Sequence, residues 1–136
     1  MQPLPETEDP LVVRTDFSDD AAWRAVVEAV REPTGGDGFT AYVDLLDDPA
    51  YQGLSKDRLM ELVSEDSDHT FLMVVDDVAI SHPEHPLLVV DLYDEPGLAF
   101  RAVPRSIAAI ANNLSIANMD FDDFFVGEGH IQRGFG

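Results

Sequence analysis

Two near-continuous apolar runs constrain the fold of this chain more than any other feature of its sequence. One run extends from Thr70 to Val75 and the other from Leu87 to Tyr93. A strand with one solvated face alternates apolar and polar residues, whereas a continuous apolar run of this length is typical of a strand covered on both faces. We therefore expect two buried strands with other elements packed around them.

The other segments supply further strands and helices. Segment 77–86 is compatible with a short strand, a helical turn or a loop, and Asn118 can cap a last helical turn that holds Phe121. We expect an α+β fold, with mixed α/β as the alternative: one sheet of about five strands, with helices packed mainly on one face. The further strands are expected at 11–15, 39–46 and 98–103, and the helices at 19–31, at 55–64 and from Pro104 or Ser106 onward.

A tight turn is expected between the last two strands. Pro96 and Gly97 follow Asp94 and Glu95, with proline at the second turn position and glycine at the third. This order is the preference of a type II turn. The strand after the turn should therefore pair antiparallel with the strand before it.

The length of 136 residues and the 45% hydrophobic content indicate one domain with a real core. We expect residues 1–10 to form an extended lead-in, 11–126 a single globular domain, and 127–136 a flexible tail. The N-terminus lacks the basic and apolar regions of a signal peptide, and no apolar stretch is long enough to span a bilayer. A cytoplasmic location is the resulting expectation.

The chain is strongly acidic, with 27 Asp and Glu residues against 8 Lys and Arg residues and a net charge of −19. Such a charge repels nucleic-acid phosphates and anionic lipids, so neither nucleic acid nor a membrane is expected as a partner. A basic protein partner or a divalent cation is favoured instead, although solubility or salt adaptation gives the same bias. The absence of cysteine excludes thiol chemistry and Cys-ligated zinc.

Four charged residues fall inside expected strands: Arg14, Asp44, Asp91 and Arg101. The hairpin turn is expected to bring Asp91 and Arg101 near each other. One interpretation is an exposed sheet face with cross-strand ion pairs. The other is a polar pocket that binds an anionic ligand through the two arginines, because a guanidinium binds a carboxylate or phosphate with two hydrogen bonds.

Aspartates near the ends of the early strands suggest a metal site as a further alternative. Asp16 and Asp76 follow two of these strands, and carboxyl ends of parallel strands meet at one edge of a sheet, where carboxylates can hold Mg²⁺ or Ca²⁺. His82 and His85 form the one close histidine pair of the sequence. The prolines beside them exclude a regular His-x-x-His helix and favour a rigid loop. No resident cofactor is otherwise expected.

Three segments together resemble a known family. They are Leu11–Trp23, His82–Leu92 and Asn113–Phe121, of which the last is the most specific. They are similar to a family of small acidic actinobacterial proteins, an uncharacterised domain-of-unknown-function family. The resemblance implies a bacterial, cytosolic setting, and it supplies no activity, cofactor or catalytic residues to carry over to this chain. The aromatic ending after a mixed sheet also looks like small bacterial toxin-immunity domains.

Three functions are compatible with the sequence. The chain contains no Gly-x-Ser-x-Gly, Walker or Gly-x-Gly-x-x-Gly motif, so the balance lies against an enzyme. We favour a non-enzymatic binding domain, such as an acidic inhibitor or immunity-type protein for a basic partner. A metal-binding protein or metal-assisted enzyme is the second hypothesis, and a carrier or sensor of a small anionic ligand is the third.

Overall fold

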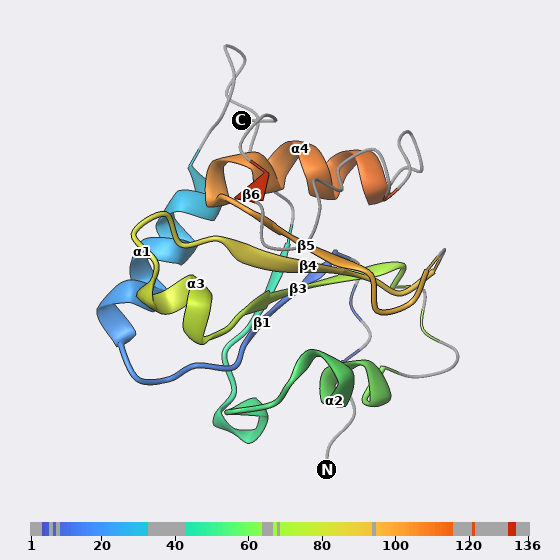
Figure 1. Cartoon of the computed structure of the whole chain (residues 1–136), viewed down its shortest axis with the longest axis horizontal. Coiled ribbons are helices and arrows are strands. Elements are labelled where there is room, and N and C mark those ends of the chain that lie inside the picture. Colours follow the sequence, from blue (N-terminus) through green and yellow to red (C-terminus); the bar gives the residue numbers. More distant parts are fainter. Residues whose placement is uncertain are drawn as a thin grey trace.

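The computed structural model describes residues 4, 5, 7, 9–32, 43–63, 67, 69–93, 95–115, 121, 131 and 132. The start of the strand expected at 39–46 and most of the turn expected after Asn118 lie outside these residues. In chain order, the elements are β1 (Leu11–Arg14), α1 (Asp20–Arg31), β2 (Asp44–Leu46), the 3₁₀ helix η1 (Pro49–Tyr51), α2 (Lys56–Glu61), β3 (Phe71–Val75), α3 (Asp77–Ser81), β4 (Leu87–Asp91), β5 (Ala99–Ala102), α4 (Pro104–Ser115) and β6 (Ile131–Gln132); Figure 1 labels all of them except β2 and η1.

The described strands form one mixed sheet of six strands in the order β2-β1-β3-β4-β5-β6. β1 is parallel to both β2 and β3, β4 is antiparallel to both of its neighbours, and β5 is parallel to β6. The fold is therefore α+β, as the sequence predicts. The sixth strand is β6, which lies within the range 127–136 that the sequence analysis assigned to a tail.

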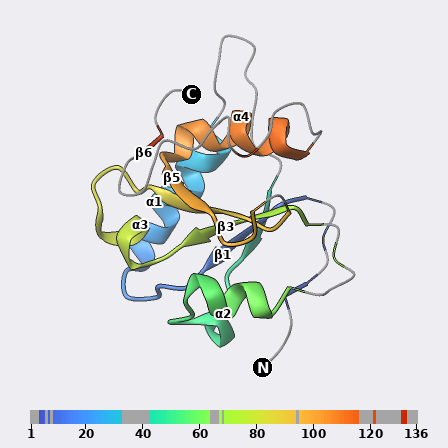
Figure 2. The same cartoon turned by 45° about the vertical axis from the view of Figure 1, so that its right-hand side comes forward.

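Helices cover both faces of the sheet, and most of them lie on one face. On that face, α1, α3 and α4 pack over an apolar cluster that includes Trp23, Ile80 and Ile107. On the other face, η1 and α2 bury Tyr51 and Leu59 against the sheet. Figures 1 and 2 show α4 and α1 on one side of the strands and α2 on the opposite side.

Both apolar runs form buried strands, as expected. Every residue of β3 is buried, and its side chains alternate between the two apolar clusters, with Met73 in one and Val74 in the other. β4 behaves in the same way, apart from the half-buried Leu88. Two-sided burial removes the polar positions that a half-exposed strand would show, which explains the uninterrupted apolar runs.

Aspartates begin several of the helices. The side chain of Asp19 accepts a hydrogen bond from the backbone N–H of Ala22 at the start of α1, and Asp76 accepts one from Ala79 at the start of α3. These bonds satisfy amides that have no partner within a helix, and carboxylates there also suit the positive end of the helix dipole. Segment 77–86, which the sequence left open, therefore begins as a short helix. Pro83 follows its C-cap, His82, where proline disfavours further helical turns.

The turn between β4 and β5 is built as the sequence predicts. The N–H of Leu98 donates to the carbonyl of Glu95 at 2.9 Å, and Gly97 has φ of 97°, as the third position of a type II turn requires. The carboxylate of Asp91, which is 2% exposed, accepts hydrogen bonds from the N–H groups of Tyr93 and Glu95. Asp91 therefore serves the backbone of the hairpin.

We expect Asp91→Ala to lower the free energy of unfolding by about 2–3 kcal/mol, because it removes two charge-assisted hydrogen bonds and leaves two amides to find new partners. The measurement is urea denaturation followed by circular dichroism. Glu28→Ala, which removes an exposed carboxylate from the middle of α1, should cost less than about 0.5 kcal/mol. Equal losses for the two variants would show that Asp91 does not hold the hairpin.

Candidate functional site

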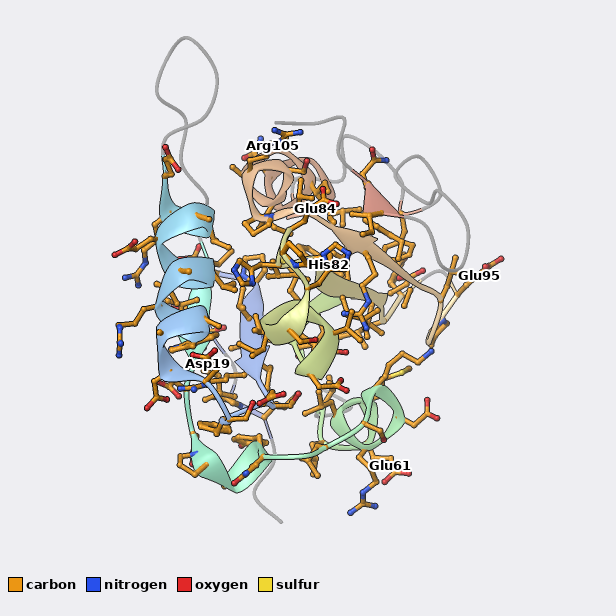
Figure 3. The ribbon with its side chains drawn as sticks, turned by 60° about the vertical axis from the view of Figure 1, so that its left-hand side comes forward. Asp19, Glu61, His82, Glu84, Glu95 and Arg105 are labelled. Atoms are coloured by element: carbon orange, nitrogen blue, oxygen red, sulfur yellow. The ribbon has the colours of Figure 1, made fainter. Side chains whose placement is uncertain are left out.

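A cleft of about 670 Å³ lies where β1 and β3 end. Figure 3 shows the segment from η1 to α2 running below α1 and α3, which is the side of the molecule on which the cleft lies. The lining comes from the exits of β1 and β3, the η1–α2 segment and the first half of β4: Thr15, Asp16, Phe17, Ser18, Gln52, Gly53, Leu54, Ser55, Lys56, Val74, Asp76, Asp77 and Leu88.

The topology of the sheet explains the position of the cleft. The chain leaves β1 through α1 on one face to reach β2, and returns through α2 on the other face to reach β3. The two connections therefore run over opposite faces, and the strand order reverses at β1, whose carboxyl end lies beside that of its parallel neighbour β3. Crevices at such switch points are where open α/β sheets bind ligands.

One backbone contact holds the η1–α2 segment against the exit of β1. The N–H of Gly53 donates to the carbonyl of Thr15 at 2.8 Å. Gly53 has φ of 75°, a conformation that residues with a Cβ rarely adopt. The loop thus forms one wall of the cleft in a defined position.

The cleft combines an apolar floor with an acidic rim. Val74 and Leu88 are cross-strand neighbours on β3 and β4, and their side chains lie on the same face of the sheet. Asp16, Asp76 and Asp77 supply the carboxylates, and Lys56 is the one cation in the lining. The ammonium of Lys56 donates to the carbonyl of Gly97 at 2.7 Å. A cationic group with an apolar stem would match both parts of this lining.

Asp16 is held as a carboxylate by its neighbour. Its Oδ1 accepts hydrogen bonds from both the hydroxyl and the backbone N–H of Ser18. These bonds, with a smaller contribution from the charge of Arg14, lower the pKa of Asp16 below its ordinary value of 3.8. Asp16 therefore keeps its negative charge to a lower pH than an ordinary aspartate does.

Arg14 is committed to contacts within the chain. Its side chain is 4% exposed, and its guanidinium donates to Asp20, to Asp47 and to the carbonyl of Asp16. The guanidinium also lies 4.3 Å from the centroid of the Phe17 ring. The hydrogen bond and charge of Arg14 lower the pKa of Asp20. Arg14 does not line the cleft and joins the β1–α1 connection to the end of β2.

The hairpin predicts that Arg101 lies near Asp91, but Arg101 pairs with Asp76 instead. Its two terminal nitrogens donate to the two oxygens of Asp76 at 2.7 and 2.8 Å, and it also reaches the carbonyl of Pro86. Arg101 faces Leu88 across the β4–β5 pair. Asp91 lies three residues further along β4, and because side chains alternate along a strand it points to the other face.

The four expected ligand residues do not converge. Asp44 lies on the edge strand β2, where its Oδ2 accepts from the N–H of Asp9 and helps to hold the preceding segment. Arg14 and Arg101 bind different aspartates. Among these four residues, none lines the cleft, although Arg101 reaches its rim through Asp76.

The expected metal residues divide into two places. Asp16 and Asp76 both line the cleft. His82 and His85 lie in the loop after α3, where Nδ1 of His82 accepts from the N–H of Glu84 and Nδ1 of His85 lies 2.9 Å from the carbonyl of Ala79. In the described residues, no three His, Asp or Glu side chains are placed to hold one metal ion.

Several cleft residues were not predicted from the sequence, chiefly Phe17, Asp77 and the 52–56 loop. A signal for Asp77 was available, because it stands next to Asp76 directly after a buried strand. The loop also carried two signals: Gly53, and Ser55, whose hydroxyl caps α2. Neither signal says which strand end the loop will approach.

The chain belongs to a family of domains of unknown function, DUF6924, whose model matches residues 9–135. This confirms the resemblance to a domain-of-unknown-function family. No curated protein matches the chain. In the parts of the chain that the structure describes, every helix is too short or too polar to cross a bilayer.

We expect Ser18→Ala to destabilise the fold near neutral pH but not at strongly acid pH. The pKa of Asp16 is lowered in the folded state, so its ionised form stabilises the fold above the ordinary value of 3.8. That contribution disappears as the pH falls through the lowered value. The stability difference between the natural protein and the variant should therefore shrink below pH 3.8. The measurement is a series of urea denaturations across this range.

Ser81→Ala is the matched control for this series. The hydroxyl of Ser81 is also exposed, but it donates to the backbone carbonyl of Asp77 and to no carboxylate. Its effect on stability should not change with pH. A Ser18→Ala effect that is equally independent of pH would contradict the role assigned to Ser18.

Proposed function

We propose that this member of the DUF6924 family is a non-enzymatic binding domain that receives a basic surface of a partner protein at the cleft. The observation that carries the proposal is the acidic rim around an apolar floor at the switch point of the sheet. An inhibitor or immunity-type protein for a basic enzyme is one form that such a domain takes. The bacterial, cytoplasmic setting is part of the same proposal.

The charge balance around the cleft supports a cationic partner. Three cations, Arg14, Arg101 and Lys56, lie in or beside the cleft, and two of them are already bound to carboxylates. The nearby carboxylates outnumber them: Asp16, Asp20, Asp47, Asp76 and Asp77. The net charge of −19 over the whole chain adds a long-range field. Such a field accelerates encounters with basic proteins and weakens as salt is added.

Most charged groups of the cleft already make hydrogen bonds and ion pairs within the chain, which favours binding over catalysis. Asp76 holds Arg101 and caps α3, and Asp16 holds the backbone at Ser18. A general acid or base must exchange protons with a substrate near the working pH, and the lowered pKa of Asp16 opposes that role. The lining of the cleft within the described chain contains no histidine.

The two alternative functions gain less support from the geometry. A carrier of small anions needs arginines with free donors in the cleft, whereas Arg14 and Arg101 already bind aspartates. A metal site needs several oxygen ligands around one point, and the rim offers Asp16 and Asp76 with hydrogen bonds already in place. A binding domain for a basic partner needs none of these existing contacts to be broken.

We expect the protein to bind a synthetic peptide of alternating arginine and glycine, and to bind it more weakly as salt rises. The double variant Asp16→Asn/Asp77→Asn should weaken binding about tenfold, equivalent to about 1.4 kcal/mol, because it removes two rim charges. The measurement is isothermal titration calorimetry at low salt and at physiological ionic strength.

The matched control is Glu28→Gln/Glu32→Gln, which removes the same charge from α1 and from its C-cap, outside the cleft lining. It should weaken binding by less than about twofold through the long-range field alone. Equal effects of the two double variants would show that the net charge, and not the cleft, holds the peptide. A peptide affinity that does not change with salt concentration would contradict the proposal as a whole.

A further inference from the structure

We infer that the cleft is built for a single arginine side chain of the partner's basic segment, with its methylene stem on the apolar floor and its guanidinium at the rim. This inference rests on the proposed function and names its recognition element. It commits to arginine over lysine and over a neutral side chain of the same shape. Its basis is the arrangement of the floor, the free carboxylate oxygens and one aromatic ring.

The floor suits a methylene stem. Val74 and Leu88 lie opposite each other on β3 and β4, and Leu88 is the one half-buried residue of its strand. Long basic side chains commonly lay their methylenes along apolar surface and keep the charged head in water or at carboxylates. The volume of about 670 Å³ is within the usual range for ligand pockets and leaves room for residues that flank the arginine.

The rim offers carboxylates that are not consumed within the chain. Asp77 is exposed in the first turn of α3, and in the described part of the molecule its carboxylate has neither an ion pair nor a hydrogen bond. Asp16 uses Oδ1 for Ser18. Lys56 also lines the cleft, and its ammonium donates to the carbonyl of Gly97. The carboxylate of Asp77 is therefore available to an incoming cation.

The molecule itself shows how a guanidinium fits groups of this kind. Arg101 binds Asp76 with two parallel hydrogen bonds at the edge of the cleft. Arg14 lies over the ring of Phe17, a half-buried residue that also lines the cleft. Planar guanidinium groups make both contacts better than the compact ammonium of lysine. Asp77 is the acid of the lining whose carboxylate is not already held within the described residues, and a guanidinium can bind it with two parallel hydrogen bonds, which an ammonium cannot.

The test compares four peptides that differ at one central residue: arginine, lysine, citrulline and the arginine homologue with one methylene fewer. Isothermal titration calorimetry gives each dissociation constant. We expect arginine to bind at least about threefold tighter than lysine, because of the paired hydrogen bonds. The shorter homologue should bind about fourfold more weakly than arginine, because burial of one methylene is worth about 0.8 kcal/mol. Citrulline, which keeps the stem and loses the charge, should show no measurable binding.

Asp77→Asn and Asp57→Asn provide the matched pair of variants. Both residues are exposed aspartates in the first turn of a short helix, but only Asp77 lines the cleft. Asp77→Asn should weaken the arginine peptide about three- to tenfold, and Asp57→Asn should leave its affinity within about twofold.

The outcomes separate this inference from the proposed function. If arginine and lysine peptides bind equally well, with the usual dependence on salt, the arginine site is overturned and the general basic partner stands. If the shorter homologue binds as tightly as arginine, the stem does not lie on the floor and the inference fails. If neither basic peptide binds, the proposed function fails with it.

Discussion

The two-sided burial of β3 is the constraint on which the rest of the structure depends. Phe71–Val75 has hydrogen-bonded neighbours on both sides, parallel β1 and antiparallel β4, and apolar layers above and below. Such a strand stabilises the fold only if helices cover both faces. The α1 connection, which leaves β1, and the α2 connection, which leaves β2, therefore run over opposite faces of the sheet. The cleft at the ends of β1 and β3 follows from this arrangement. The burial of β3 on both faces therefore accounts for both the core and the cleft.

The acidic residues have two separable roles. Several aspartates satisfy backbone amides where strands end and helices begin, among them Asp19, Asp48, Asp76 and Asp91. These charges are part of the fold, and they would be present whatever the chain binds. Others, such as Asp77, remain open to solvent at the cleft. The proposed cationic partner would bind this second group, and not the net charge alone.

Local signals in the sequence predicted most elements. The apolar runs predicted β3 and β4. The order Pro96-Gly97 predicted the turn, because the backbone preferences of these two residues determine the turn type. The short helix α3 was one of three readings, since a five-residue helix has little periodicity to detect. β6 was missed for a similar reason: two residues form a strand only through their pairing with β5.

The candidate site was only partly predictable. Asp16 and Asp76 were placed at one sheet edge because the parallel arrangement of strands implies it. The partner of Arg101 was not predictable from the hairpin, because strand alternation places Asp91 on the opposite face and the β3–α3 connection brings Asp76 to Arg101 instead. Contacts of this kind depend on register between distant segments, which residue types alone do not determine.

The most direct test of the central claim is backbone amide chemical-shift mapping of the ¹⁵N-labelled protein during titration with the arginine–glycine peptide. The account predicts shifts concentrated in residues 15–18, 52–56 and 76–77, which surround the cleft. Shifts gathered on another surface, such as the exposed side of α1, would contradict it. So would small shifts spread evenly over the whole chain, which would indicate attraction to the net charge without a site.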